Sequence, residues 1–322
     1  MDNKEYKVSI ILPVHNGERY LSSAIESIIT QTYENIELII IDDFSSDHSN
    51  EIAKSYAQKD SRVRVYRNKE NKKLPRSLNA GFKMATGEFF TWTSDDNLLK
   101  PETIQALVEV FQKKPDVDFV YADIIPIDEN GRVKKMSYLN GEVEDIYVFN
   151  PVLACFMYRR KVHETLKGYN PNKFLYEDYD FWLKMCRNKK KIKVIYQPYV
   201  LYRRSANSLT SYSGERALEK FNIAFKNAVY EMDLNMKYIS DPIEKMCIWD
   251  CQMAELSTIC VQQALTEGLQ MLESFVHERG FNCSPQKFAD NEYWISTSLL
   301  WDSVESEVAF KNYLRKYNIN KI

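Results

Sequence analysis

Near its amino terminus the chain reads Val8-Ser-Ile-Ile-Leu-Pro-Val-His-Asn-Gly17, a mostly apolar, β-branched run that passes into polar residues. A second run of this kind, at 36–41, is also followed by polar residues, at 42–46. Such runs are typical of strands that are buried on both faces of a largely parallel sheet. Apolar residues at helical spacing lie between the two runs, at 20–29. The chain therefore opens with a strand, a helix and a strand, which indicates an α/β fold.

Strands and helices continue to alternate over the next part of the chain. The pattern predicts helices at 50–58, 75–85 and 101–113, and strands at 63–66, 89–93 and 119–122. The alternation then loosens, with a turn at 129–131 and a short strand near 154–158, and long amphipathic helices follow at 243–275 and 291–317. We predict a domain at 1–213, made of halves 1–97 and 98–213, followed by a helical extension at 214–322.

Composition excludes several classes of protein. The 322 residues carry a net charge of -2, with 44% hydrophobic and 27% charged residues, which argues against a nucleic-acid partner held by bulk charge. No apolar run approaches the ~20 residues of a membrane span, and the first residues lack the apolar stretch of a secretory signal. The six cysteines show no Cys-x-x-Cys spacing. We expect free thiols and a cytoplasmic protein.

Three polar clusters, at 13–16, 42–46 and 94–97, fall where predicted parallel strands end, which is where open α/β sheets bind ligands. In the third cluster Asp95 and Asp96 are adjacent. Paired carboxylates suit Mg²⁺ or Mn²⁺, and such a cation would carry a diphosphate. Capping of the next helix is an equally open reading, because Asp and Asn favour turns and helix starts.

Taken together, these segments resemble the family 2 glycosyltransferases, inverting enzymes with the GT-A fold, over roughly residues 6 to 210. Residues 8–17 resemble the first strand and nucleotide loop of that family, and residues 37–47 resemble the second. Residues 71–88 resemble the segment that leads into the metal motif. The resemblance implies a nucleotide diphosphate sugar as donor, with a UDP-sugar preferred, and a Mn²⁺ or Mg²⁺ ion.

The resemblance also implies roles for the donor-side residues. By position, Asp42 hydrogen-bonds the nucleobase, although Asp42 and Asp43 also suit the cap of a turn. The first loop adds contacts to the nucleotide from Pro13, Val14, His15 and Asn16, with His15 standing where many relatives have Tyr.

The family's metal motif is Asp-x-Asp-Asp, followed by three residues and Pro, and registering it on Pro101 assigns the cation to Asp96. Asp95 then holds the ribose or the water shell of the metal. Two positions depart from the family pattern, because Ser94 replaces the first Asp and Ser205 stands where His is frequent. Candidates for holding the diphosphate in place of that His are Arg203, Arg204, Lys73 and Arg76, each of which could equally be a solvated surface charge.

The segment Phe174-Leu-Tyr-Glu-Asp-Tyr-Asp-Phe-Trp182 resembles the family's Glu-Asp motif at the start of an acceptor-site helix. The resemblance makes Asp178 the catalytic base, which takes the proton of the acceptor hydroxyl during attack. Glu177, Tyr179 and Trp182 become acceptor contacts. Carboxylates also favour helix amino termini without any chemistry, so capping stays open here too.

We therefore expect an inverting, metal-dependent hexosyltransferase that moves a sugar to a saccharide hydroxyl in the assembly of surface polysaccharide or protein glycans. The acceptor is lipid-linked or protein-linked, and the lysine-rich stretch 187–193 would suit peripheral contact with the inner face of the membrane. The apolar faces of the C-terminal helices would suit a homo-oligomer. The alternatives are a non-catalytic nucleotide-sugar-binding or assembly protein and a sugar-phosphate nucleotidyltransferase, for which the first loop lacks the Gly-rich sequence.

Overall fold

The computed structural model describes residues 6–134, 146 and 150–204, and a few later positions, at 218, 222, 223, 225, 226, 270, 271 and 274. The chain divides into two compact units, Met1–Ile146 with Asn150–Ser205, and Tyr147–Phe149 with Ala206–Ile322. All elements described below belong to the first unit. The C-terminal helices predicted from the sequence lie outside the described residues, except for positions 270, 271 and 274. The predicted domain boundaries stay predictions. No helix among the described residues is long and apolar enough to cross a membrane.

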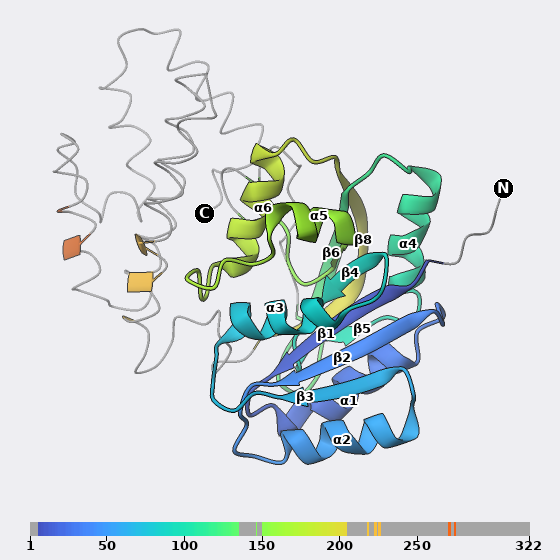
Figure 1. The fold of residues 1–322 in the computed structure, drawn as a ribbon, viewed down its shortest axis with the longest axis vertical. Coiled ribbons are helices and arrows are strands. Elements are labelled where there is room, and N and C mark those ends of the chain that lie inside the picture. Colours follow the sequence, from blue (N-terminus) through green and yellow to red (C-terminus); the bar gives the residue numbers. More distant parts are fainter. Residues whose placement is uncertain are drawn as a thin grey trace, which may run out of the picture. The chain divides into compact units, whose positions relative to one another are not determined.

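A single eight-stranded sheet forms the centre of this unit, in the order β3-β2-β1-β4-β7-β6-β8-β5 (Figure 1). Its first half is parallel and consists of β1 (Val8–Val14), β2 (Ile36–Asp42), β3 (Val63–Arg67) and β4 (Phe89–Trp92). Parallel strands end at the same edge, so the loops after β1, β2 and β4 come together there.

The second half of the sheet is mixed. It consists of β5 (Leu98–Leu99), β6 (Phe119–Ile127), β7 (Phe156–Arg159) and β8 (Ile192–Arg203). Strand β7 runs antiparallel to both β4 and β6, and β8 runs parallel to β6 with a register irregularity around Asp123. Strand β5 pairs antiparallel with β8 at the outer edge. Beyond β6, Gly131 takes a left-handed φ of 81° in the predicted turn, which the backbone closes by a hydrogen bond from Asp128 N to Arg132 O.

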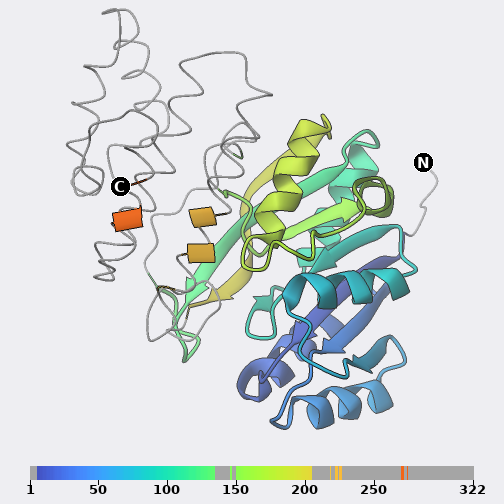
Figure 2. The same ribbon diagram turned by 60° about the vertical axis from the view of Figure 1, so that its left-hand side comes forward.

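Helices cover both faces of the sheet (Figures 1 and 2). One face carries α1 (Glu18–Ile29), α2 (Ser49–Lys59) and α4 (Thr103–Lys113), and the other carries α3 (Leu74–Met84), α5 (Arg160–Leu166) and α6 (Glu177–Arg187). Strand residues alternate between the faces, so Ile10 and Leu12 of β1 join the core with α1. Ile11 points to the opposite face, where a Cβ on Gly81 of α3 would lie only 2.6 Å from its Cγ2.

The core under α3, α5 and α6 is rich in aromatic rings. Phe82 of α3 stacks on Phe90 of β4 with ring centroids 4.9 Å apart, and Trp182 of α6 stacks on Phe119 of β6 at 4.8 Å. Such pairs contribute about 0.5–1.5 kcal/mol each beyond their buried area. They fix α6 against the sheet, and α6 carries the Glu-Asp motif.

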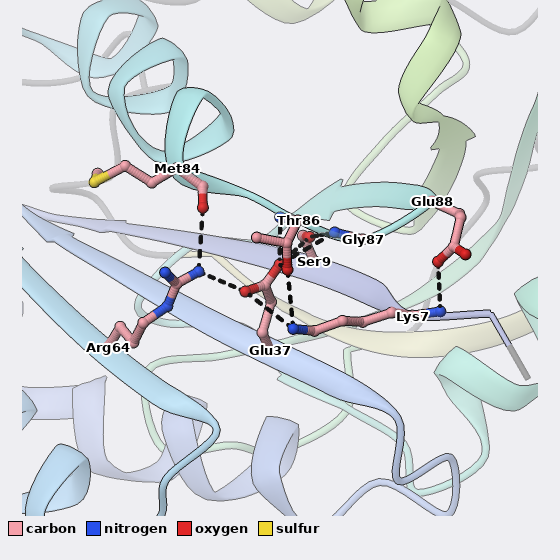
Figure 3. Close-up of polar contacts among 8 residues, drawn as sticks. All are labelled: Lys7, Ser9, Glu37, Arg64, Met84, Thr86, Gly87 and Glu88. Carbon is pink, nitrogen blue, oxygen red and sulfur yellow. Dashed lines mark hydrogen bonds and ion pairs between the residues drawn. The ribbon is translucent and has the colours of Figure 1, made fainter.

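At the amino-terminal edge of the parallel strands a buried carboxylate joins several chain segments (Figure 3). Glu37 of β2 accepts hydrogen bonds from Ser9 Oγ at 2.6 Å, from Thr86 N at 2.6 Å and from Thr86 Oγ1 at 2.9 Å. It also pairs with Arg64 of β3 and, at 3.5 Å, with Lys7. Burial alone would raise its pKa, but these hydrogen bonds and the charge of Lys7 outweigh burial and lower the pKa to about 2.

The structure confirms the strands and helices that the sequence predicted over the first half of the domain, with ends that differ by a few residues. Three elements were not predicted, namely β5, α5 and β8. All three lie within the predicted half 98–213. Elements α5 and β8 lie where the alternation loosens, and β5 is only two residues long.

Candidate active site

The loops after β1 and β2 are held together by side chains of the first motif. His15 Nδ1 lies 2.8 Å from the carbonyl oxygen of Asp43. A carbonyl only accepts, so this nitrogen carries the ring proton, and His15 Nε2 accepts from the amide of Asn71 at 3.1 Å. Asn16, with a left-handed φ of 56°, accepts from Ser46 N at 2.8 Å through its side-chain oxygen. The imidazole of His15 is therefore fixed in orientation although it is exposed.

Two carboxylates stand at the end of β2, Asp42 as its last residue and Asp43 directly after it, and both residues are buried but have different partners. Asp42 has no exposed surface, and its oxygens accept from Ser45 N and Asn50 Nδ2, each at 2.9 Å, and pair with Arg67 Nε at 3.1 Å. Asp43 uses one oxygen, Oδ1, to accept from Asn68 Nδ2 and Lys72 N, each at 2.8 Å. Its other oxygen has no partner among the described residues. The oxygens of Asp42 are thus engaged within the protein, whereas Asp43 keeps one that a ligand could use, and the nucleobase contact of Asp42 stays a prediction.

The first carboxylate after β4 packs directly against the loop after β1. A Cβ on Gly17 would lie 2.0 Å from Asp95 Oδ2, so only glycine leaves room for this carboxylate. Burial, and then the neighbouring charge of Asp96, raise the pKa of Asp95 to about 7. Asp47 adds a third negative charge nearby, and it accepts from Glu18 N at the start of α1 at 3.1 Å.

The second carboxylate, Asp96, lies in a loop that is anchored by a buried arginine. Burial raises the pKa of Asp96, and the charge of Arg203 opposes this. Arg203 is only 6% exposed and donates from Nε to the Asp96 carbonyl at 3.0 Å and from Nη1 to the carbonyls of Asp128 and Glu129, at 3.0 and 3.1 Å. Its guanidinium also lies 4.2 Å from the ring centroid of Tyr20. Arg203 is thus engaged by the protein itself, and a contact of Arg203 with a diphosphate stays a prediction.

These carboxylates fit a divalent cation chemically. Two adjacent, partly buried carboxylates with raised pKa values gain stability from a positive charge between them. No group of three or more His, Cys, Asp or Glu side chains arranged to hold a metal occurs in the part of the chain that the structure describes. Mg²⁺ does not need one, because it is commonly held by one or two carboxylates, water and substrate phosphates.

A second pair of carboxylates opens α6 on the other side of the site. Burial raises the pKa of Asp178, against hydrogen bonds from Tyr179 N at 2.6 Å and Asn150 Nδ2 at 3.4 Å. Burial, and then the charge of Asp178, raise the pKa of Glu177 to about 8. Glu177 is 4% exposed, and its Oε2 has no hydrogen-bond partner among the described residues. Of the pair, Asp178 is the more exposed carboxylate.

A buried chain of hydrogen bonds links β4 to the segment that leads into α6. Trp92 Nε1, at the end of β4, donates to Tyr169 Oη at 2.8 Å, and Tyr169 Oη lies 3.3 Å from Tyr158 Oη. Asn79 of α3 holds the backbone of Tyr169 on both sides, accepting from its N–H at 3.0 Å and donating to its carbonyl at 2.7 Å. The charges of Asp178 and Glu177 act on the Tyr169 phenol. Tyr169 also packs on Phe181 of α6 with ring centroids 4.7 Å apart, so the end of β4 and α6 are joined through one tyrosine.

Other predicted site residues occupy different places. Trp182 is fully buried between Phe119 and Phe156, so it packs the core and is removed from the acceptor contacts. Tyr179 is also buried, at 6% exposed. Arg76 is exposed on the first turn of α3, next to Lys73, whose ammonium lies 5.6 Å from the ring of Phe174. Both cations stay candidates for the diphosphate.

Sequence reasoning gave no role to several residues on which the site depends, namely Gly17, Asp47, Asn79 and Tyr169, although they lie within segments that resemble the family. Two signals were present. Gly17 directly follows the first polar cluster, and Tyr169 follows a glycine, Gly168, whose φ of 69° is left-handed. Neither signal names its partner, which comes from a distant segment.

Comparison with known proteins agrees with this geometry. The model of the family "Glycosyl transferase family 2" matches residues 9–167. EpsE of Bacillus subtilis, named as a glycosyltransferase, is 35% identical over 188 residues, which cover 56% of this chain and 67% of that protein. The glycosyltransferase RT0329 of Rickettsia typhi is 35% identical over 191 residues, but the match spans only 58% of its length.

Solved structures of low sequence identity share the fold. TarS of S. aureus in complex with UDP-GlcNAc superposes with a TM-score of 0.59 at 20% identity, covering 82% of this chain and 75% of that one. The mannosyltransferase PcManGT of Pyrobaculum calidifontis, in complex with GDP-Man and Mn²⁺, gives a TM-score of 0.55 at 15% identity, covering 98% and 87%. From the sequence match, the sheet and its strand-end carboxylates, we conclude that this chain belongs to family 2 of the glycosyltransferases and has a GT-A type fold.

Proposed function

We propose that the protein transfers a sugar, with inversion, from a nucleotide diphosphate sugar to a hydroxyl of a glycan acceptor. The observation that carries this proposal is the linkage of three motifs at one edge of the sheet. His15 bonds to Asp43, Asp95 packs on Gly17, and Trp92 bonds to Tyr169, which packs on Phe181 of α6. A donor sugar bound across these strand ends would lie close to the proposed catalytic base on α6, which would activate the acceptor hydroxyl.

The base of the donor is recognised by the loops after β1 and β2. Asp43 has an oxygen without a partner among the described residues, and a carboxylate can accept from the ring N–H of uracil. We assign Asp42 the supporting role of fixing Arg67 and the loop. Pro13, Val14, His15 and Asn16 line the first loop. We propose UDP as the nucleotide. The structural neighbours support a nucleotide sugar as donor but do not select the nucleobase, since TarS was solved with UDP-GlcNAc and PcManGT with GDP-Man.

The diphosphate is placed at the end of β4. Asp96 would hold a Mn²⁺ or Mg²⁺ ion, with Asp95 beside it fixing the ribose or bound water. When bound, such an ion supplies positive charge that stabilises the departing diphosphate. Ser94, where the family pattern has Asp, leaves this chain with Asp95 and Asp96 alone in the motif. The exposed Arg76 and Lys73 at the start of α3 are the protein cations proposed for the phosphates.

The chemical step is assigned to Asp178. Its carboxylate takes the proton from the acceptor hydroxyl while the hydroxyl oxygen forms a bond to the anomeric carbon. The bond between that carbon and the diphosphate breaks in the same displacement, so attack from the opposite side inverts the centre. Burial raises the pKa of Asp178, which makes its carboxylate a stronger base than an ordinary surface carboxylate.

The acceptor and its cellular setting are also proposals. We propose a saccharide acceptor in surface polysaccharide or protein glycan assembly, carried on a lipid or on a protein, at or near the inner face of the membrane. A homo-oligomer is proposed from the apolar C-terminal sequence, and light scattering on the full chain tests it.

The test is a donor screen on the full chain with Mn²⁺ present, in which UDP-, GDP- and dTDP-sugars are offered with mixed saccharide acceptors and the released nucleoside diphosphate is measured. We expect release from one class, and Asp178→Asn should lower turnover by ~100-fold or more while leaving affinity for that diphosphate within about twofold. Asp180→Asn is the matched control, because it removes a carboxylate from the same helical turn that pairs with Lys184. Unchanged turnover of Asp178→Asn refutes the base assignment. Nucleotide binding without release from any donor instead supports a non-catalytic binding protein.

A further inference from the structure

Phe44 is a large apolar side chain in an unexpected place. It directly follows Asp43 in the loop after β2, and it is 50% exposed. Its backbone takes a left-handed φ of 64°. Phenylalanine is strained in this conformation relative to glycine, and half of its surface stays exposed to solvent. Burial in the fold therefore gives only a weak reason for an aromatic residue at this position.

The ring of Phe44 is nevertheless held in place. The guanidinium of Arg67 lies 5.7 Å from the ring centroid, within reach of a cation–π interaction. Arg67 is itself fixed, since Nε pairs with Asp42 at 3.1 Å and Nη2 donates to the carbonyl of Ser45 at 2.7 Å. The buried Asp42 thus positions an exposed aromatic ring through one arginine.

Phe44 directly follows one of the residues assigned to the nucleobase. Asp43, the preceding residue, keeps one oxygen free of protein partners within the described chain, and its carbonyl accepts from the fixed imidazole of His15. A planar heterocycle is usually held by an aromatic face together with a polar group at its edge. We infer that Phe44 provides the aromatic surface on which the nucleobase of the donor packs, with Asp43 at the base edge, so that Phe44 helps to set nucleotide affinity. This inference rests on the proposed nucleotide sugar donor.

The experiment compares Phe44→Gly, Phe44→Leu and the wild-type full chain for binding of UDP, GDP and dTDP by calorimetry with Mn²⁺. Loss of stacking should weaken binding of the preferred nucleotide by roughly tenfold in both variants. Thermal unfolding is measured in parallel. Phe44→Gly should be as stable as wild type or more stable, because glycine adopts φ near 64° without strain, so weaker binding cannot be due to unfolding. Tyr196→Leu removes a similarly exposed aromatic ring, 59% exposed on β8, and serves as the control with unchanged binding.

The outcomes separate this inference from the proposed function. If wild type binds a nucleotide and both Phe44 variants bind it with the same affinity, the inference is overturned and the donor proposal stands. If Phe44→Leu binds the nucleotide as tightly as wild type and only Phe44→Gly binds it more weakly, the site needs an apolar side chain of some size but not an aromatic ring. That result also overturns the inference. A wild-type chain that binds none of UDP, GDP and dTDP overturns the donor proposal and the Phe44 inference together.

Discussion

Replacing Glu37 by glutamine should measure how strongly one carboxylate holds the amino-terminal edge of the sheet (Figure 3). The side chain of Glu37 is 5% exposed, and its pKa is lowered from 4.5 to about 2. A difference of that size corresponds to about 3 kcal/mol of stability at neutral pH. Glutamine keeps one oxygen for Ser9 and Thr86 but loses the charge that Arg64 and Lys7 pair with. We expect Glu37→Gln to lower the free energy of unfolding at pH 7 by about 2–3 kcal/mol.

The pH dependence gives the sharper result. The folded pKa lies below the unfolded one, so this stabilisation is complete above pH 4.5 and is lost as the pH falls toward 2. The gap between wild type and Glu37→Gln should therefore narrow by about 2 kcal/mol between pH 7 and pH 3. Other titrating carboxylates are common to both proteins and drop out of the difference.

The assay is urea unfolding of the full chain followed by circular dichroism at several pH values, with nucleotide binding at pH 7 as a second readout. Glu34→Gln is the matched control, since it makes the same charge change at an exposed residue near Arg62 and should alter stability by no more than about 0.5 kcal/mol. Nucleotide affinity should not change in Glu37→Gln, because Glu37 lies at the edge opposite the strand-end loops. A loss below about 1 kcal/mol at pH 7, or a gap that does not narrow in acid, refutes this reasoning.

Three further predictions concern the site. Gly17→Ala should weaken nucleotide binding in the presence of Mn²⁺ by about tenfold or more, as expected when a group beside a metal is displaced, because a Cβ there would lie 2.0 Å from Asp95 Oδ2. Calorimetry measures this affinity, and an affinity equal to that of wild type would show that the Asp95 carboxylate can move at no cost. Asp96→Ala should abolish the difference in UDP affinity between Mn²⁺ and chelator, and a retained difference removes Asp96 from the metal site. Arg203→Lys should lower the melting temperature by several degrees, on the order of 2–4 °C for each kcal/mol lost, because lysine cannot reach three carbonyls at once; an unchanged melting temperature in a thermal scan contradicts that anchoring role.

The parallel half of the fold was predictable because β1, β2 and β4 are buried on both faces over most of their length and read as apolar runs. Strand β8 was not, since Ile192–Arg203 mixes polar and apolar residues and includes Pro198. Its place depends on pairing with β6 and β5, which come from distant parts of the sequence. Sequence patterns record burial along a segment, whereas this strand is defined by its partners.

The site was predictable in its motifs and less so in its individual side chains. Asp42 has the same parity along β2 as Ile40, which places it on the α1 face of the sheet. Both faces of β2 are buried, so the pattern alone does not separate the roles of Asp42 and Asp43. Trp182 lies one helical turn after Asp178, yet the aromatic core covers it, and only tertiary packing reveals this. The carbonyls that surround the Arg203 guanidinium leave no trace in the sequence.

The position of Arg203 bears on how the domain can be dissected. This residue ends β8, well beyond the region matched by the family model, yet it fastens the Asp96 loop and packs on Tyr20 near the start of the chain. A fragment that stops at residue 167 would contain every donor-side motif and lack the side chain that anchors one of them. The donor half is thus not an autonomous module that could be excised or exchanged between relatives, and chimeras that respect this tie should join after residue 203.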